Sequence, residues 1–435
     1  GGPINVTGTG GSYVSVNSNL TVSGSTNGVL LKSTTGVIYG GTLTTAGGDI
    51  TLWANSGGGA TGGISVNNNS TLSSNGGWIT LGGSVGTIAG MPATTTLGTA
   101  LPQGYAQNIS SMIGLTLGST QAYGYNTNAN LNLNSNNGRI TIAGKSTATG
   151  TMSFGVVAYS GSNINAGTGD IYMYGWSAGS GNSEAFGINT APWYSTVANP
   201  SPLLWKTNGG NINLVGAVNT SATGYGHAID LQLNTTVENI SANSGSVTLT
   251  GNSSGATTSN DSFRLWNVNI LSASGNIKLN STTAGNSMYV VGGTNLNLGA
   301  LTGSDVTSST SNITITTDSY NFAAPTNIKT SGTVSVLPYS NSFSSAVTLP
   351  SNFTLSSTVT GFTVGKTTNN ADLTLNDSVS IVGPITAYAN ALTVGGTQTV
   401  TGSGNGITLL SAQGSAGLMS INSALTTNGG NITLY

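Results

Sequence analysis

A short motif, in which a glycine-rich turn precedes an apolar-x-apolar triplet, recurs along this chain of 435 residues. Alternation with a period of two places aliphatic side chains on one face of a strand and Thr, Asn or Ser on the other. Clusters of Gly, Asn and Ser, which suit turns, separate the strand segments. The copies of the motif read GGDITL, GGWITL, NGRITI, TGDIYM, GGNINL, SGSVTL, SGNIKL and GGNITL. The pattern predicts an all-β chain built from many short strands.

The spacing of the motif predicts stacked coils. Its first aliphatic residue moves from Ile50 to Ile79, a step of 29 residues, and from Ile171 to Ile212, a step of 41. Two further strand segments fit within most steps. Three short strands per coil of about 30 residues are typical of a right-handed parallel β-helix, a solenoid whose coils stack at about 4.8 Å. About 13 coils, or a stack of about 60–65 Å, are expected. A series of β-sandwiches or β-barrels is the alternative, and the irregular spacing disfavours it.

The composition agrees with stacked coils and excludes several classes of protein. The chain has eight Lys and Arg, ten Asp and Glu, one His and no Cys, so that charged residues make up 4 %. Because identical charges on successive coils would repel, a charge-poor surface suits a repetitive stack. Eight scattered basic residues cannot form a nucleic-acid footprint. Disulfides and cysteine zinc sites are excluded, and no apolar run reaches the ~18–20 residues of a membrane helix.

A longer repeat relates the two ends of the sequence. Gly2-Pro3-Ile4 matches Gly383-Pro384-Ile385, and residues 44–53 match residues 426–435. Both ends stop inside a regular coil without a polar cap, which solenoids need to stay soluble. The repeat predicts one module of a longer tandem array. Separate chains that stack head to tail into a fibre are an alternative that the sequence leaves open.

These observations divide the chain into three predicted regions. The regions are a β-helix over 1–300 with loop insertions near 84–111 and 189–206, a less regular β-helix or module junction over 301–381, and the start of a second copy of the 1–53 repeat over 382–435. The insertions are expected to leave the sheet as loops because they contain proline, which cannot donate to a strand ladder.

Two segments resemble a known family. The string TTAGGDITLWANSGGGATGGISVNNNSTLSSNGGWITLGGS, residues 44–84, looks like the repeats of giant bacterial exoproteins of the filamentous-haemagglutinin type. The string TVTGFTVGKTTNNADLTLNDSVSIVGPITAYANAL, residues 358–392, is similar to them as well. The resemblance implies secretion, display at the bacterial cell surface, a β-helical shaft, and a role in adhesion, biofilm or cell-surface coating. It supplies no catalytic motif.

The residues themselves indicate no enzyme. β-Helical enzymes that act on polysaccharides need paired carboxylates or Asp clusters that hold calcium. The acids here are widely spaced, and the closest two, Asp372 and Asp377, flank a strand segment. His227 is expected in a loop or turn, and Asp230 would face the opposite side of any strand that contained both. We predict no catalytic residue, no metal and no cofactor, although isolated turns could bind calcium.

Aromatic side chains mark the candidate contact residues. The insertion over 189–206 carries Trp193, Tyr194 and Trp205, which could contact a partner or a glycan. The alternatives are that such insertions pack on the shaft, or that they form lateral contacts between rods. A second aromatic group is expected to stack along one face of the coil, and its members are Trp53, Tyr172, Tyr174 and Trp176.

The expected function is a non-catalytic structural and adhesive module of a long secreted bacterial surface fibre. Its expected partners are further copies of itself, joined head to tail or packed laterally, and surface glycans. A glycan-binding or glycan-processing β-helix that uses the aromatic loop 189–206 is the alternative. Ice binding is disfavoured because it requires flat, regular Thr-x-Thr ranks, whereas the coil length here varies.

Overall fold

The computed structural model contains β-strands and no helix within the residues that it describes. These are residues 2–59, 61–108, 112–119, 129–150, 152–179, 181, 184–190, 201–219, 224–232, 237–254, 259–285, 287–292, 295–349, 352–412 and 417–435. The chain divides into two compact units, Gly1–Ala242 with Asn252–Asn260 and Asn243–Gly251 with Asp261–Tyr435. Each unit is a right-handed parallel β-helix, which confirms the predicted fold class.

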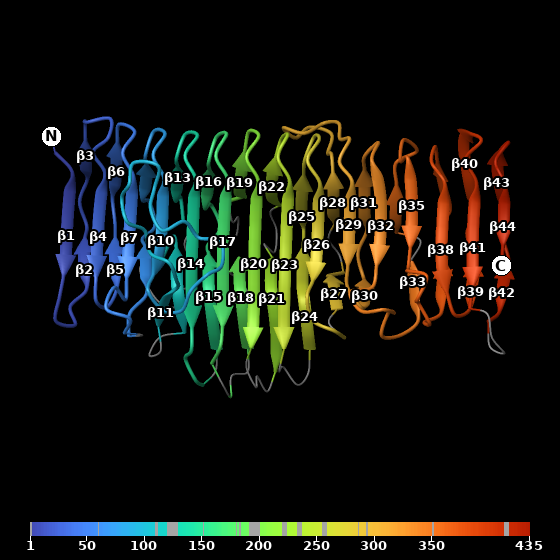
Figure 1. The fold of residues 1–435 in the computed structure, drawn as a ribbon, viewed down its shortest axis with the longest axis horizontal. Coiled ribbons are helices and arrows are strands. Elements are labelled where there is room, and N and C mark those ends of the chain that lie inside the picture. The colour runs from blue at the N-terminus through green and yellow to red at the C-terminus, as the bar shows by residue number, and fades with distance from the viewer. Residues whose placement is uncertain are drawn as a thin grey trace. The chain divides into compact units, whose positions relative to one another are not determined.

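In the first unit, consecutive strands belong in turn to three parallel sheets, named A, B and C, so that three strands complete one coil (Figure 1). Sheet A contains β1 (Ile4–Gly8), β4 (Val29–Ser33), β7 (Ile50–Ala54), β10 (Ile79–Gly83), β14 (Ile140–Ser146), β17 (Ile171–Ser177) and β20 (Ile212–Asn219). Sheet B contains β2 (Val14–Val16), β5 (Val37–Tyr39), β8 (Ile64–Val66), β12 (Ile113–Leu117), β15 (Met152–Ala158), β18 (Glu184–Thr190) and β21 (Tyr225–Gln232). Sheet C contains β3 (Leu20–Val22), β6 (Thr42–Thr45), β9 (Thr71–Ser73), β13 (Asn132–Asn134), β16 (Asn163–Asn165), β19 (Leu203–Thr207) and β22 (Glu238–Ala242).

The second unit repeats the same succession of strands. Its first sheet contains β23 (Val247–Ser254, of which the first five residues belong to this unit), β26 (Ile277–Ser281), β29 (Ile313–Thr316), β32 (Thr333–Leu337), β35 (Gly361–Val364), β38 (Ile385–Ala389), β41 (Ile407–Ser411) and β44 (Ile432–Leu434). The second strands of the coils are β24 (Ser259–Trp266), β27 (Ser287–Val290) and β30 (Ser319–Phe322), then β33 (Val347–Leu349), β36 (Leu373–Leu375), β39 (Leu392–Val394) and β42 (Met419–Ile421). The third strands are β25 (Val268–Leu271), β28 (Leu296–Gly299), β31 (Thr326–Lys329) and β34 (Phe353–Leu355), then β37 (Val379–Ile381), β40 (Gln398–Ser403) and β43 (Leu425–Asn428).

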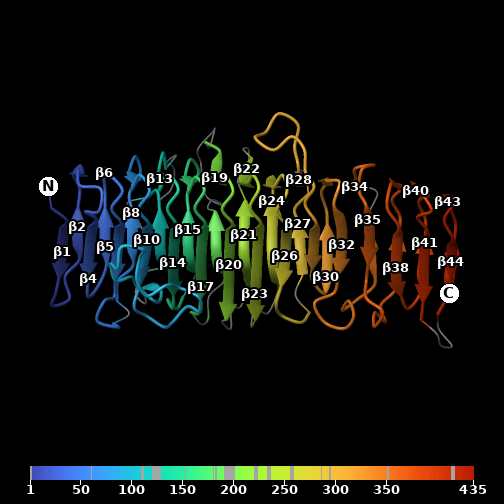
Figure 2. The same cartoon turned by 45° about the horizontal axis from the view of Figure 1, so that its top comes forward.

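Two of the sheets of the second unit are interrupted. The second sheet ends at β30 and a new one begins at β33, and the third sheet ends at β34 and a new one begins at β37. Both breaks lie inside the 301–381 stretch for which we predicted lower regularity. Just before them, Figure 2 shows the connection between β28 and β29 as an excursion from the coil edge, and its Val306 packs back against Leu271 and Ala300.

The interior of each coil is a stack of aliphatic side chains. Ile50 pairs with Ile79, which pairs with Ile140, and each of them is fully buried. Burying one such side chain is worth about 1.5–3 kcal/mol. Because every inward position rests on the same kind of residue in the next coil, a triplet repeated in the sequence becomes a continuous core.

The glycine that precedes each triplet is required by the stacking of the turns. Gly77, Gly138 and Gly169 lie one above the other, and a Cβ on any of them would clash with the backbone oxygen of the glycine in the preceding coil. The hydroxyls of Ser74 and Ser135 donate to the carbonyls of Gly77 and Gly138 in the same turns. The recurring Gly-x-Ile of the sequence is therefore a close approach between backbones.

A second column of glycines explains the longest strands of the first unit. Gly144 pairs with Gly175, which pairs with Gly216, and at these points sheet A touches the backbone of sheet B. Beyond the glycines both sheets continue as a thin double layer, filled by small buried side chains such as Ser146 and Ser177. In Figure 1 the lower ends of β14, β15, β17, β18, β20 and β21 form this extension.

The described part of the 84–111 insertion, residues 84–108, packs on the outer face of sheet A. Ile88 and Met91 bury their side chains against Ala143 and Tyr174. The insertion returns as β11 (Ala106–Asn108), which pairs with the second half of β14, whereas β10 pairs with the first half. The expectation of a loop is therefore wrong for residues 106–108, because they complete a ladder that β10 is too short to cover.

Candidate interaction surfaces

Most of the carboxylates that the structure describes support the coil. Asp49 Oδ1 accepts a hydrogen bond from the backbone N–H of Trp78 at 2.8 Å, and Asp170 Oδ1 accepts one from the N–H of Asn211 at 2.7 Å. These acids occupy the position before the triplet, and each accepts the N–H at the same position of the next coil. Asn312 Oδ1 does the same for Thr333 in the second unit, at 2.9 Å.

Two further acids bind turns of the second unit. Asp318 accepts hydrogen bonds from the N–H of Ser340 at 2.8 Å and from the N–H of Gly285 at 2.9 Å. Asp372 Oδ1 accepts one from the N–H of Ala391 at 3.0 Å. These carboxylates are therefore occupied by backbone donors. Within the described residues, no three of His, Cys, Asp and Glu come together as a metal-binding group.

One pair of acids, Asp230 and Glu238, comes close together in a way that we did not predict. Both side chains are fully buried. Asn189 and Gln232 donate to Asp230 Oδ2 at 3.1 and 3.0 Å, and Thr190 donates to Glu238 Oε1. Burial, reinforced by the charge of Asp230 and opposed by the Thr190 hydrogen bond, raises the pKa of Glu238 well above its usual value. The pair is sealed from solvent, so it offers no site for a substrate.

His227 lies in a strand, and the expectation of a loop or turn is wrong. It belongs to β21, is 2 % exposed, and its ring centre lies 5.4 Å from that of Phe186. Phe186 in turn stacks on Phe154 at 5.2 Å, so the imidazole continues a ladder of aromatic rings across three successive coils. Asp230 pairs with Asn189 of the neighbouring coil and is itself fully buried, whereas His227 pairs with Phe186.

Of the three predicted contact residues of the 189–206 insertion, the structure describes Trp205 alone. Trp205 is in β19 and is fully buried between Ile164 and Ile240 of the neighbouring coils, so the expectation of a contact loop is wrong for this residue. It fills an inward position because Leu203, Trp205 and Thr207 alternate with outward Leu204 and Lys206. Trp193 and Tyr194 lie outside the described residues.

Aromatic and cationic side chains gather instead on the outer face of sheet A of the first unit. Lys32 Nζ lies 4.4 Å from the ring centre of Trp53, and Lys145 Nζ lies 3.7 Å from that of Trp176. The Arg139 guanidinium lies 3.9 Å from the ring centre of Tyr172. Such contacts stabilise a pair by about 0.5–1 kcal/mol at exposed sites.

The prediction that aromatic residues stack on this face is confirmed for Tyr172 and Tyr174, whose rings are 6.3 Å apart and nearly parallel. Part of the group is covered by the insertion, because Tyr105 makes an edge contact with Trp176 at 5.7 Å. Burial raises the pKa of Tyr105 to about 12, with a further contribution from Tyr174. The rings of this face are therefore engaged in contacts within the protein.

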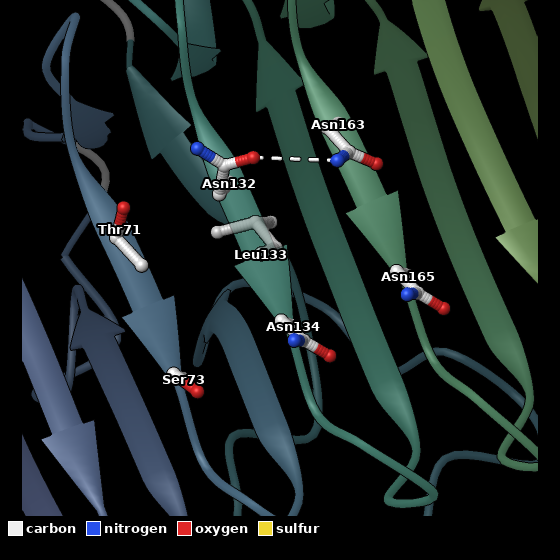
Figure 3. A pocket seen from close by; sticks show the side chains of 7 residues that line it. All are labelled: Thr71, Ser73, Asn132, Leu133, Asn134, Asn163 and Asn165. Carbon is white, nitrogen blue, oxygen red and sulfur yellow. Dashed lines mark hydrogen bonds between the residues drawn. The ribbon is translucent and has the colours of Figure 1, made fainter.

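The outer face of sheet C carries a flat polar surface, which we call the amide face (Figure 3). Its side chains come from β9, β13 and β16, and they are Thr71, Ser73, Asn132, Asn134, Asn163 and Asn165. They form two columns in register, and Asn163 Nδ2 donates to Asn132 Oδ1 at 3.3 Å. The groove between the columns has a volume of about 250 Å³, and none of the described residues that line it is charged.

No family model matches the chain, and no curated protein matches it. Over the described part of the chain, no helix has the length and apolar character needed to span a membrane.

Proposed function

We propose that this chain is a non-catalytic structural and adhesive module of a long secreted bacterial surface fibre, similar to the filamentous-haemagglutinin type. The observation that carries the proposal is the structural position of the long repeat. Ile4 of β1 corresponds to Ile385 of β38, and Ile50 of β7 corresponds to Ile432 of β44. All four begin strands of the first sheet of a coil, and twelve coils separate each pair along the chain. A repeat that returns in phase with the coil is what a tandem array requires.

The chemistry of the coil suits a mechanical role. Backbone ladders, stacked aliphatic side chains and side-chain caps stabilise it without any disulfide. With 4 % charged residues, the surface has little charge for salt to screen. Such a shaft would keep its stiffness over a wide range of ionic strength.

The amide face supports lateral packing of shafts. Each Asn amide donates and accepts hydrogen bonds, so an array of amides is complementary to a second copy of itself. Stacked Asn ladders stabilise assemblies of strands in this way. We therefore place lateral contacts at Asn132, Asn134, Asn163 and Asn165.

Fibre diffraction from oriented native material tests the proposal. Twelve coils at about 4.8 Å predict an axial repeat of about 58 Å, together with a strong 4.8 Å reflection along the fibre axis. Compact isolated particles in electron micrographs, or a 4.8 Å reflection perpendicular to the fibre axis, would contradict it.

A glycan-binding β-helix is the second candidate function. Because Trp205 is fully buried, it cannot contribute to a glycan-binding site on the 189–206 insertion. What favours the candidate now is an uncharged pocket with two tyrosines in the second unit.

A further inference from the structure

We propose that the outer face of the second repeat copy binds a neutral saccharide in a pocket formed by Tyr388, Leu410 and Tyr435. This inference rests on the second candidate function and names its site and ligand class. The pocket has a volume of about 330 Å³, which is at the lower end of the range for small-molecule sites. It therefore suits a ligand of one or two sugar rings.

The floor of the pocket is an outward column of the first sheet of this unit. Tyr388 of β38 pairs with Leu410 of β41, and the backbone of Tyr435 exchanges hydrogen bonds with Leu409 and Ser411 of the same strand. The column thus presents two tyrosine rings, two coils or about 9.6 Å apart, with an aliphatic side chain between them. Aromatic rings with a polar tip pack on apolar ring faces while they remain wet at one end.

The wall of the pocket is the turn after β35, which is held rigidly. Asn369 is 5 % exposed, and its Nδ2 donates to the carbonyl of Tyr388 at 2.8 Å. Its Oδ1 accepts from Ser342 Oγ at 2.9 Å and from the N–H of Phe343 at 3.2 Å. Thr368 Oγ1 donates to the carbonyl of Asn341 at 2.6 Å. A wall fixed before binding lowers the entropy lost when a ligand is bound.

The polar side chains of the pocket wall can form hydrogen bonds with the hydroxyl groups of a sugar. Thr367 and Asn370 are exposed, and among the residues that the structure describes their side chains have no hydrogen-bond partner. A hydroxyl and an amide placed beside tyrosine rings can both donate to and accept from sugar hydroxyls. Among the described residues that line the pocket none is charged, so none of them would compensate the charge of an acidic sugar. These features together point to a neutral saccharide.

The chain offers a matched control. The equivalent column of the first copy contains Thr7, Lys32 and Trp53, where Lys32 occupies the ring face of Trp53. An aromatic side chain alone therefore does not make the pocket, because the ring face of the first copy is already covered.

Saturation-transfer NMR of the full chain tests the site with cellobiose, lactose and N,N′-diacetylchitobiose, and with a sulfated heparin disaccharide as the charged comparator. We expect at least one neutral disaccharide to receive saturation and the heparin disaccharide to receive none. Tyr388→Ala and Tyr435→Ala should each weaken binding about tenfold. Tyr388→Phe and Trp53→Ala should leave it unchanged. Far-UV circular dichroism checks the fold of each variant, and Thr367→Val, which cannot hydrogen-bond, probes the wall independently.

The outcomes separate this inference from the functions that it extends. If the Tyr388→Ala, Tyr435→Ala and Thr367→Val variants still bind a neutral disaccharide, the proposed pocket is wrong, whereas the glycan-binding function still stands. Binding of none of the neutral disaccharides overturns both. Fibre diffraction reports on the structural function and is unaffected by either result.

Discussion

In the first sheet of the coils, the two copies of the long repeat, residues 1–53 and 382–435, both keep aliphatic side chains at the inward positions and differ in their outward side chains. The inward pairs are Ile4 and Ile385, Val29 and Ile407, Leu31 and Leu409, Ile50 and Ile432, and Leu52 and Leu434. At the outward positions of the same strands, Lys32 over Trp53 in one copy becomes Leu410 beside Tyr435 in the other. The comparison shows that the stacking of coils restricts which residues can occupy inward positions. The outward positions tolerate different residues, so a binding surface can form there.

The largest expected effect tests the shared interior. Leu31→Ala and Leu409→Ala each remove a fully buried side chain, so each should lower the free energy of unfolding by about 2–5 kcal/mol. Urea unfolding followed by circular dichroism measures the change. Thr408→Ala, on the outward face of the same strand as Leu409, should change stability by less than about 0.5 kcal/mol. A loss in only one copy would break the equivalence of the two interiors.

The turn glycines extend the comparison to the backbone. A Cβ at Gly48 would clash with the carbonyl oxygen of Asn27, and one at Gly430 would clash with that of Asn405. Gly48→Ala and Gly430→Ala should each cost about 1–3 kcal/mol in thermal or urea unfolding. Gly57→Ala is the control, because its Cβ would meet only a methyl group of Thr34 at 3.7 Å. Tolerance of both turn variants would show that the turns do not stack as described.

Glu238 is an exception to the rule that inward positions are apolar, because this acidic side chain is buried at an inward position of β22. Burial raises its pKa, so the folded chain keeps the proton that the unfolded chain releases above about pH 4.5. The wild-type chain should therefore lose stability as pH rises above this value, whereas below it both states are protonated and nothing is lost.

Glu238→Gln should remove this loss, and the difference in unfolding free energy between the variant and the wild type should grow from pH 5 to pH 8. A difference that stays constant across this range would mean that Glu238 is not the titrating group.

The smallest expected effect concerns the outward difference itself. Lys32→Leu, which gives the first copy the residue of the second, should cost about 0.5–1 kcal/mol through loss of the contact with Trp53. Leu410→Lys, which gives the second copy the residue of the first, should introduce a cation beside Tyr388 and Tyr435 and reduce saccharide binding in the pocket. Thermal unfolding and the NMR titration measure these two results. Stronger saccharide binding by Leu410→Lys would reverse the assignment of a neutral ligand.

The coil could be predicted because its restraints are local and repeated. The Gly-x-Ile turn predicts where a strand begins, and the period-two alternation after it predicts which face of the strand is buried. Trp205 could have been placed inside by the same rule, since Leu203, Trp205 and Thr207 alternate inward. The prolines just before this strand obscured the signal, because they are typical of loops.

Other features could not be predicted, because they depend on contacts between distant segments. Thr190 of β18 donates a hydrogen bond to Glu238 of β22, which follows it by 48 residues, and sequence spacing does not reveal this contact. The docking of Ile88 and Met91 on Ala143 and Tyr174 joins an insertion to strands that follow it by more than fifty residues. The candidate pocket likewise combines the turn after β35 with three later coils.

The central claim is that successive strands stack in parallel and in register, and engineered disulfides test it most directly, because the chain has no cysteine of its own. Thr42 pairs with Thr71 between β6 and β9, so their Cα atoms lie about 4.8 Å apart, within the span of a disulfide. Thr42 and Ser73 are offset by two residues, which places their Cα atoms about 8 Å apart, beyond that span. We predict that mass spectrometry under non-reducing conditions will find rapid oxidation of Thr42→Cys/Thr71→Cys and none of Thr42→Cys/Ser73→Cys. Equal cross-linking of both pairs, or cross-linking of the offset pair alone, would contradict the stacked coil.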